Sequence, residues 1–293
     1  MGALNMPTFD TPQPISAVID VVSGEVRVTA SERADTVVDV QPTDAANRDD
    51  VRTAERTRVH FAGGHLIVKA PKLRSWAPRS ESGSIDVTIE LPAGSRVHGA
   101  AQLADFRCDG PIGECRIKTG LGQVQLDEVG TLSLKSGTGD VLVDRVTGDA
   151  DVMTGSGDVR VRELASSAVI KNSNGDTWVG TANRDLRVNA ANGSVSIDVA
   201  NADVNARSAN GDVRLGEAVR GSVALETKLG DVEVGIREGT SAWLDVNAAA
   251  GKVHNGLEAA EAPAASAETV DVRARTTVGA IVIRRASDHE PAR

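Results

Sequence analysis

The sequence Ser-Gly-Thr-Gly-Asp-Val-Leu-Val at residues 136–143 returns in related form at residues 155–161, 173–179 and 209–215. Each copy places a glycine directly before a short segment in which apolar and polar residues alternate. These glycines follow one another at intervals of 17 to 21 residues, most often 18, and a last one comes after 28. They are Gly122, Gly139, Gly157, Gly175, Gly193, Gly211, Gly230, Gly251 and Gly279. The chain is therefore built from a repeat of about eighteen residues.

Each repeat contains two short strand patterns. Two and four residues after the glycine stand apolar residues such as Val159 and Val161, and the residue between them is polar or variable, such as Arg160. A second apolar pair follows half a repeat later, as in Leu186 and Val188. Period-two alternation with β-branched residues indicates half-buried strands. The predicted order within each repeat is strand, turn, strand, turn, and the predicted fold class is all-β.

Two architectures accommodate this repeat. In a right-handed parallel β-helix, or β-solenoid, each coil stacks on the preceding one at a rise of about 4.8 Å. In an antiparallel meander or β-sandwich, each Asn-Gly pair closes a hairpin. A meander leaves one apolar face to be covered, and the repeats contain no amphipathic helix, whereas the two sheets of a solenoid cover each other. Aromatic residues make up only 2% of the chain, which suits a thin core, so the solenoid is favoured.

The region before the repeats is also rich in strand patterns, but these are less periodic. Residues 42–56 are polar and predict one short helix, and residues 72–82 predict a long loop. Ends of repeat arrays need atypical caps, which is the role expected for this region. The predicted organisation is disorder at residues 1–8, a β-rich N-terminal cap at 9–105, solenoid repeats at 106–285 and a disordered tail at 286–293.

An acidic residue directly follows the glycine in many copies, and it is the strongest candidate for a ligand. The column contains Asp140, Asp158, Asp176, Asp212 and Asp231. In calcium-binding β-rolls the aspartate stands two residues after the last glycine instead. Since Asn and Asp favour turns, we expect each aspartate to bond local amides of its own turn. No metal site is predicted.

The other candidate residues do not form a recognisable catalytic constellation. The five histidines lack the spacing of zinc ligands, and His60 and His65 flank Gly63-Gly64 in what we expect to be a hairpin. No nucleophile elbow, phosphate-binding loop or dinucleotide fingerprint occurs. The histidines are His60, His65, His98, His254 and His289. The sequence therefore predicts no catalytic, cofactor-binding or metal-binding residues, no cofactor, and a protein that is not an enzyme.

Charge and composition exclude further classes of partner. The formal net charge is -9, and an acidic chain gains nothing from counterion release on nucleic acid. No stretch of eighteen apolar residues is present, so no membrane span is predicted. We find no secretory signal, and Cys108 and Cys115 are expected to be reduced, buried thiols. A cytoplasmic location is therefore expected.

The Ser-Gly-x-Gly-Asp-Val-x-Val and Asn-Gly-Asp-Val-x-Leu units resemble the bacterial putative-adhesin family of β-strand-repeat domains, a family of unknown function. The resemblance extends from about Val18 to Ile283. The composition is rich in Arg, Asp, Ala and Val and poor in Lys, which is similar to actinobacterial members. The resemblance implies a β-helix-like fold with no established catalysis.

Three functions are consistent with these observations. The first is a non-catalytic scaffold or binding module, whose partner would be a protein, an envelope component or another copy of the chain. The second is a carbohydrate-binding or carbohydrate-active β-helix; Trp178 is the one aromatic residue expected to point outward in the middle of the stack. The third is a polymer assembled through the solenoid ends.

Overall fold

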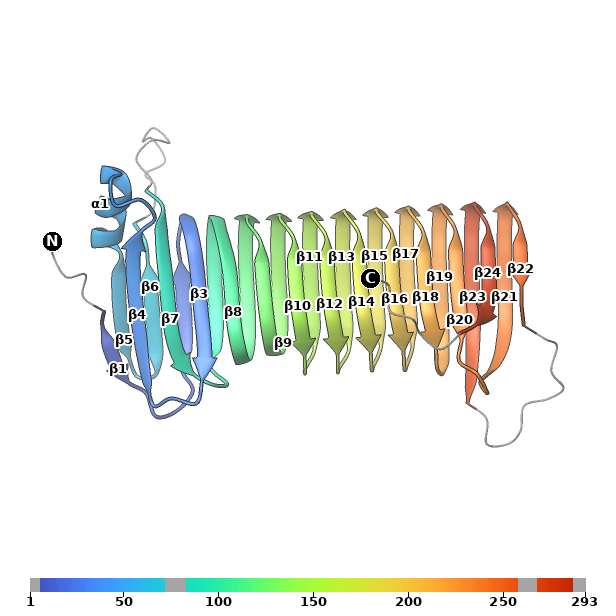
Figure 1. Cartoon of the computed structure of the whole chain (residues 1–293), viewed down its shortest axis with the longest axis horizontal. Coiled ribbons are helices and arrows are strands. Elements are labelled where there is room, and N and C mark those ends of the chain that lie inside the picture. The colour runs from blue at the N-terminus through green and yellow to red at the C-terminus, as the bar shows by residue number, and fades with distance from the viewer. Residues whose placement is uncertain (1–5, 72–82, 258–267, 287–293) are drawn as a thin grey trace. The chain divides into compact units, whose positions relative to one another are not determined.

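A computed structural model describes residues 6–71, 83–257 and 268–286 (Figure 1). The chain divides into two compact units, Met1–Thr147 and Gly148–Arg293. Both units consist almost entirely of β-strands. None of the helices in the described part of the chain is long and apolar enough to span a membrane.

The first unit contains strands β1 to β10 and helix α1 (Arg48–Arg56). β2 lies parallel between β6 and β8, and β3 lies parallel between β7 and β8. β8, β9 and β10 continue this parallel stacking. The strands are β1 (Thr8–Asp10), β2 (Ser16–Asp20), β3 (Ser23–Ser31), β4 (Asp35–Pro42), β5 (Arg58–Ala62), β6 (His65–Lys69), β7 (Ile85–Pro92), β8 (Arg96–Leu121), β9 (Val124–Thr138) and β10 (Val141–Val146).

The N-terminal end of this unit is closed by antiparallel strands and the helix. β1 pairs with β4, β4 with β7, and β5 with β6, all antiparallel. The helix predicted within residues 42–56 is confirmed as α1, which packs against β4 and β7. The buried Asp50 of this helix accepts the Asp44 and Ser84 amides at 3.1 and 2.8 Å. Since these bonds fix the helix to the chain on both sides, α1 covers this end firmly.

Three sequence predictions near this end have different outcomes. The hairpin between His60 and His65 is confirmed, because β5 and β6 are joined by Gly63 and Gly64 alone, both with positive φ. The predicted loop at residues 72–82 lies outside the described residues. Thr8, which was assigned to a disordered segment, begins β1 and pairs with Val37.

The second unit contains strands β11 to β24. Each coil supplies one strand to each of two sheets, and neighbouring coils pair in parallel, so that Val159 lies beside Thr177 and Thr177 beside Val195. Parallel pairing confirms the β-solenoid and rules out the meander. The strands are β11 (Ala150–Ser156), β12 (Val159–Leu164), β13 (Ala168–Asn174), β14 (Thr177–Ala182), β15 (Leu186–Asn192), β16 (Val195–Ala200), β17 (Val204–Asn210), β18 (Val213–Ala218), β19 (Gly221–Leu229), β20 (Val232–Ile236), β21 (Ser241–Ala250), β22 (Val253–Asn255), β23 (Thr269–Val278) and β24 (Ile281–Arg285).

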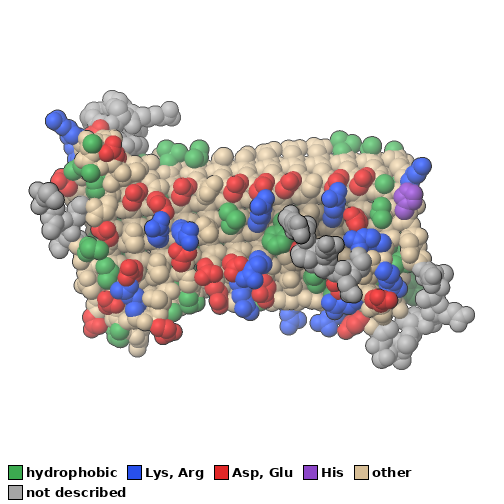
Figure 2. Space-filling model, in the orientation of Figure 1, with side chains coloured by type: hydrophobic (Ala, Val, Ile, Leu, Met, Phe, Trp, Pro, Cys, Tyr) green, Lys and Arg blue, Asp and Glu red, His purple; other side chains and the backbone are tan. Residues whose placement is uncertain are grey.

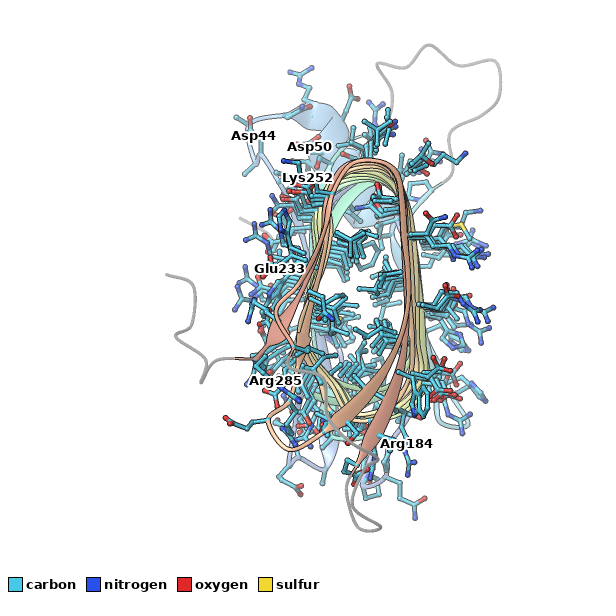
Figure 3. All side chains as sticks on the ribbon, turned by 90° about the vertical axis from the view of Figure 1, so that its right-hand side faces the viewer. Asp44, Asp50, Arg184, Glu233, Lys252 and Arg285 are labelled. Carbon is cyan, nitrogen blue, oxygen red and sulfur yellow. The ribbon has the colours of Figure 1, made fainter. Side chains whose placement is uncertain are left out.

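The core of the second unit is formed by inward columns of small and β-branched side chains. In the end-on view of Figure 3 the inward side chains of the two sheets meet between them, while Glu233 points outward. Val159, Ile170 and Val188 are completely buried. Full burial of such side chains stabilises by roughly 1.5–3 kcal/mol each, so the alternation predicted from the sequence supplies the driving force for stacking.

The order of the coils departs from the sequence order at two places. β23 lies between β19 and β21, and β24 lies between β20 and β22 (Figure 1). In the first unit, the β2–β3 coil likewise lies between the β6–β7 coil and β8. The expectation that every coil stacks on the preceding one is therefore wrong for these coils. Every coil carries the same inward pattern, so the pattern alone does not determine which coils become neighbours.

Candidate functional site

The aspartates that follow the repeat glycines connect successive coils. The Asp158 carboxylate accepts the Asp176 amide at 2.9 Å, and Asp176 accepts the Ser194 amide at 2.8 Å. Asp212 accepts the Asp231 amide at 2.9 Å. Our expectation of bonds to local amides is wrong, since each acceptor reaches the equivalent residue one coil further on. Parallel stacking places that amide within hydrogen-bond distance of the carboxylate.

These bonds bear on the calcium alternative. At least one oxygen of Asp158, Asp176 and Asp212 already accepts a backbone amide. Across residues 6–71, 83–257 and 268–286, no group of three His, Cys, Asp or Glu side chains is placed to hold a metal ion. The arrangement therefore suits stabilisation of the stack.

A ladder of asparagines runs along the same edge of the second unit. Asn192 Nδ2 donates to Asn174 Oδ1 at 2.9 Å, and Asn210 Nδ2 donates to Asn192 Oδ1 at 2.8 Å. At the opposite turn, Asn201 donates to Asn183 in the same way, at 2.9 Å. The Asn-Gly pairs indicated turn residues only, and the ladder was not predicted from the sequence. Their identical spacing of eighteen residues was the signal that could have revealed it.

A column of buried polar side chains satisfies the carbonyls of the glycine turns. Ser208 Oγ donates to Gly193 O at 2.9 Å, and Thr227 Oγ1 donates to Gly211 O at 2.8 Å. Asn172 plays the same part in its coil, bonding to the carbonyls of two glycines. These polar groups point into the solenoid and hold its turns, so they do not form a binding site.

The histidines and cysteines do not converge on one place. His98 Nε2 lies 3.6 Å from a carboxylate oxygen of Glu114, His254 lies on β22, and His289 lies outside the described residues. Cys108 and Cys115 are both free and buried. Hydrogen bonding with Cys115 and burial raise the pKa of the Cys108 thiol well above its usual value. Both features keep the Cys108 thiol protonated and unreactive.

The outer arginines lie among carboxylates. Arg160 lies 3.7 Å from Asp158, and Arg214 lies 2.9 Å from Asp212. Acidic and basic side chains are interspersed on the face seen in Figure 2. Exposed pairs of this kind contribute little to stability and indicate a solvated outer surface.

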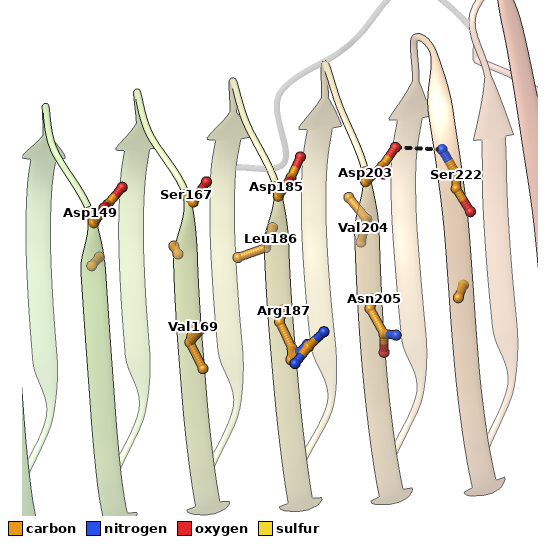
Figure 4. Close-up of a pocket in the computed structure, with 13 residues that line it drawn as sticks. Asp149, Ser167, Val169, Asp185, Leu186, Arg187, Asp203, Val204, Asn205 and Ser222 are labelled. Atoms are coloured by element: carbon orange, nitrogen blue, oxygen red, sulfur yellow. Dashed lines mark hydrogen bonds between the residues drawn. The ribbon is translucent and has the colours of Figure 1, made fainter.

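A groove of about 520 Å³ lies on the outer face of the β11–β13–β15–β17–β19 sheet of the second unit. Two rows of side chains line it, and both cross the strands (Figure 4). One row stands at the starts of the strands. In this row the Asp149 carboxylate accepts a hydrogen bond from Ser166 Oγ, and the Asp203 carboxylate accepts one from the Ser222 amide. The second row follows two residues later. The first row consists of Asp149, Ser167, Asp185, Asp203 and Ser222, and the second contains Val169, Arg187, Asn205 and Ala224.

A second hollow, of about 420 Å³, lies on the opposite sheet around Trp178. The Trp178 indole packs over Gly180, where an added Cβ would lie 3.2 Å from the ring. Its Nε1 donates to Asp198 at 3.1 Å. Trp178 points outward, as predicted, between Arg160 and Ser196 of the neighbouring coils.

One family model matches most of the chain, and several solved structures are weakly similar to it. The model of the family described as Toastrack DUF4097 matches residues 15–288. The chain is similar to a structure described as a putative adhesin from Parabacteroides merdae, with 15% identity, a TM-score of 0.47 and coverage of 79% of this chain and 95% of that one. It is also similar to one described as a putative lipid binding protein from Parabacteroides distasonis, with 10% identity, a TM-score of 0.47 and coverage of 95% and 96%. No curated protein matches the chain.

The family match covers the strand repeats from the first complete coil to the last. It confirms the family resemblance predicted from the glycine–aspartate motifs, and it is independent of the weak similarity to the solved structures. The chain belongs to the Toastrack DUF4097 family.

Proposed function

We propose that the chain is a non-catalytic module that binds an extended partner in the groove of the β11–β19 sheet. The observation that carries this proposal is that equivalent positions of five consecutive coils line the groove. At about 4.8 Å per coil, its rows extend over about 19 Å. A peptide or an envelope polymer lying across the strands would meet the same backbone geometry at every step.

The chemistry of the groove suits binding better than catalysis. The row of Asp149, Asp185 and Asp203 presents acceptors, while Arg187 and Asn205 present donors beside it. Asp149 and Asp203 already accept hydrogen bonds within the chain, which holds their carboxylates in place. A partner with its own donors, such as amides or hydroxyls, would complete the row.

The test is affinity capture from the native host followed by mass spectrometry. Arg187→Glu changes the groove, and Arg160→Glu makes the same change on the opposite sheet. We expect the wild-type chain and Arg160→Glu to capture the same partner, and Arg187→Glu to lose it. Equal capture by all three chains, or no partner for the wild type, would reject the groove as a binding site. Circular dichroism establishes that both variants are folded.

Saccharide binding is a second candidate function, favoured by Trp178. The half-buried Trp178 indole lines this hollow together with Arg160 and Ser196 of the neighbouring coils, and its exposed part is available to stack against a sugar ring. Isothermal calorimetry with cellotetraose and chitotetraose would test this. Trp178→Ala should abolish the heat of binding, whereas Trp243→Ala, which removes an exposed indole elsewhere, should leave it unchanged.

We also propose a cytoplasmic location and an actinobacterial origin. The two free, buried thiols at Cys108 and Cys115 support a reducing compartment. Cell fractionation of the native host, with antibody detection of the chain, would test the location directly. Recovery from the medium or the cell envelope would contradict it.

A further inference from the structure

We propose that two copies of this chain associate tail to tail through the coil formed by β21 and β22. The two copies are related by a two-fold axis normal to the sheets. The inference rests on the proposed non-catalytic role, and it names a second copy of the chain as one partner. Three features favour this contact: the open edge of β21, the exposed core beside it and the symmetry of the contact.

β21 is a ten-residue strand that is hydrogen-bonded along one side only. It pairs in parallel with β23, and no described strand pairs with its other side. β22 likewise pairs only with β24 among the described strands. Such an edge presents a row of backbone donors and acceptors that favours pairing with another chain.

The core beside this edge is incompletely covered. Leu244 and Val246 are only half-buried, although they occupy the same columns as Val272 and Ala274, which are completely buried one coil inward. Val253 of β22 is 43% exposed. Covering these side chains with a further coil would remove apolar surface from water.

The edge lacks the features that normally prevent strand association. From Ser241 to Ala250 the only charged side chain is Asp245, and the strand contains neither proline nor lysine. Asp245 points away from the core, where Arg273 and Arg275 contact it at 3.2 and 3.3 Å. Inward charges, prolines and short strands are the usual protection of exposed edges, and β21 has none of them.

The occupant that fits this edge is another copy of the same edge. In the first unit the corresponding end carries short antiparallel strands of three and five residues, and α1 packs against β4 and β7. Among the residues that the structure describes, that end therefore has no long open strand that could continue β21 in parallel. A contact that uses the same patch on both copies is closed by a two-fold axis and stops at the dimer.

The symmetry also determines how the strands meet. A two-fold axis normal to the sheets reverses strand direction, so β21 pairs antiparallel with the partner's β21. Setting Val246 opposite the partner's Val246 keeps the inward side chains of both copies in one core. Leu244 then faces the partner's Ala248, and Asp245 faces the partner's Asn247. This register avoids opposing two aspartates.

The amide positions suggest a variant that blocks only the open side. Ser241 N–H points toward β23, where it donates to Glu268 O at 2.9 Å. Since successive residues of a strand direct their amides to alternate sides, Ala248 directs its amide to the open edge. Ala248→Pro removes this donor and leaves the bonds to β23 intact, as prolines on edge strands do.

Sedimentation velocity of the full chain, from low to high micromolar concentration, tests the proposal. We expect a wild-type dimer, and monomers for Ala248→Pro and Leu244→Lys. Trp243→Lys, the same change one residue away and pointing outward, should remain dimeric. Asn247→Asp places two aspartate pairs across the interface, which should weaken dimerisation about two- to thirty-fold.

Two results would overturn the inference: a wild-type chain that is monomeric throughout, or a dimer that persists in both Ala248→Pro and Leu244→Lys. Neither result affects the groove of the β11–β19 sheet. A monomeric chain that still captures a partner through Arg187 would remove the tail-to-tail dimer alone. Loss of capture by a wild-type dimer would remove the proposed function alone.

Discussion

Replacing Gly193 by alanine should strongly destabilise the second unit. The φ angle of Gly193 is +138°, and a Cβ at this position would lie 2.0 Å from the carbonyl oxygen of Gly175 in the preceding coil. That oxygen belongs to the backbone, so no side chain can turn away to make room. The two coils would have to separate at this turn.

The expected loss of stability has two parts. Holding a non-glycine residue in this region of φ costs of order 1–3 kcal/mol. Separation of these two coils would also weaken the bonds between them from Gly175 N–H to Asn192 O, at 2.9 Å, and from Thr177 N–H to Ser194 O, at 2.9 Å. At about 1 kcal/mol for each hydrogen bond, Gly193→Ala should lower the free energy of unfolding by about 3–5 kcal/mol.

Equilibrium urea denaturation measures this change, and hydrogen exchange with mass spectrometry locates it. The matched control is Gly239→Ala, because Gly239 also has a positive φ, of +80°, but has no atom within 4 Å of the added Cβ. We expect the control to lose about 1–3 kcal/mol from backbone strain alone. If Gly193→Ala is no more destabilised than Gly239→Ala, close stacking does not explain why glycine stands at this turn.

Four further predictions follow from the contacts of the turns and the core. Asn192→Ala breaks both ladder bonds and should cost about 1–2 kcal/mol, measured by urea denaturation; an unchanged midpoint would contradict a structural role. Asp176→Ala should lower the melting temperature, whereas calcium should not raise that of the wild type, because these carboxylates already accept backbone amides. The thiols of Cys108 and Cys115 should react with Ellman's reagent only after unfolding, since both are buried; rapid labelling of the native chain would contradict this. Hydrogen bonding to Arg33 lowers the pKa of Asp35. The contribution of this pair to folding stability is therefore fully present above the ordinary aspartate pKa and is lost as pH falls through the lowered pKa. NMR titration should show a higher pKa for Asp35 in Arg33→Gln.

The sequence was sufficient to predict the repeat, the parallel solenoid and the inward columns. Val159, Val161 and their equivalents predict the buried side of each strand because a one-residue shift would expose every valine at once. The helix near residues 48–56 and the hairpin at Gly63-Gly64 were also predictable, since they depend on local polarity and on backbone freedom. These features depend on residues that are near one another in the sequence or that recur at a nearly constant interval.

The features that the sequence did not predict depend on contacts between coils. The bond from the Ser194 amide to Asp176 forms only after the coils have stacked. The insertion of β23 between β19 and β21 was hidden because each of these strands presents the same inward alternation to its neighbours. The groove was missed for a related reason, since its residues come from five coils and share a site only through their common register.

The repeat separates the part of the sequence that holds the fold from the part that is free to change. Two residues after the glycine nearly every coil has valine, whereas the outward residue that follows is different in most coils. These outward residues are Gln125, Leu142, Arg160, Trp178, Ser196, Arg214 and Glu233. Parallel stacking gives every outward position the same backbone geometry, so such changes alter the chemistry of the surface without disturbing the core. In a solenoid, a specific binding surface is therefore formed by differences between coils along one outward row, and the groove that crosses β11 to β19 is one place where such a row is also concave.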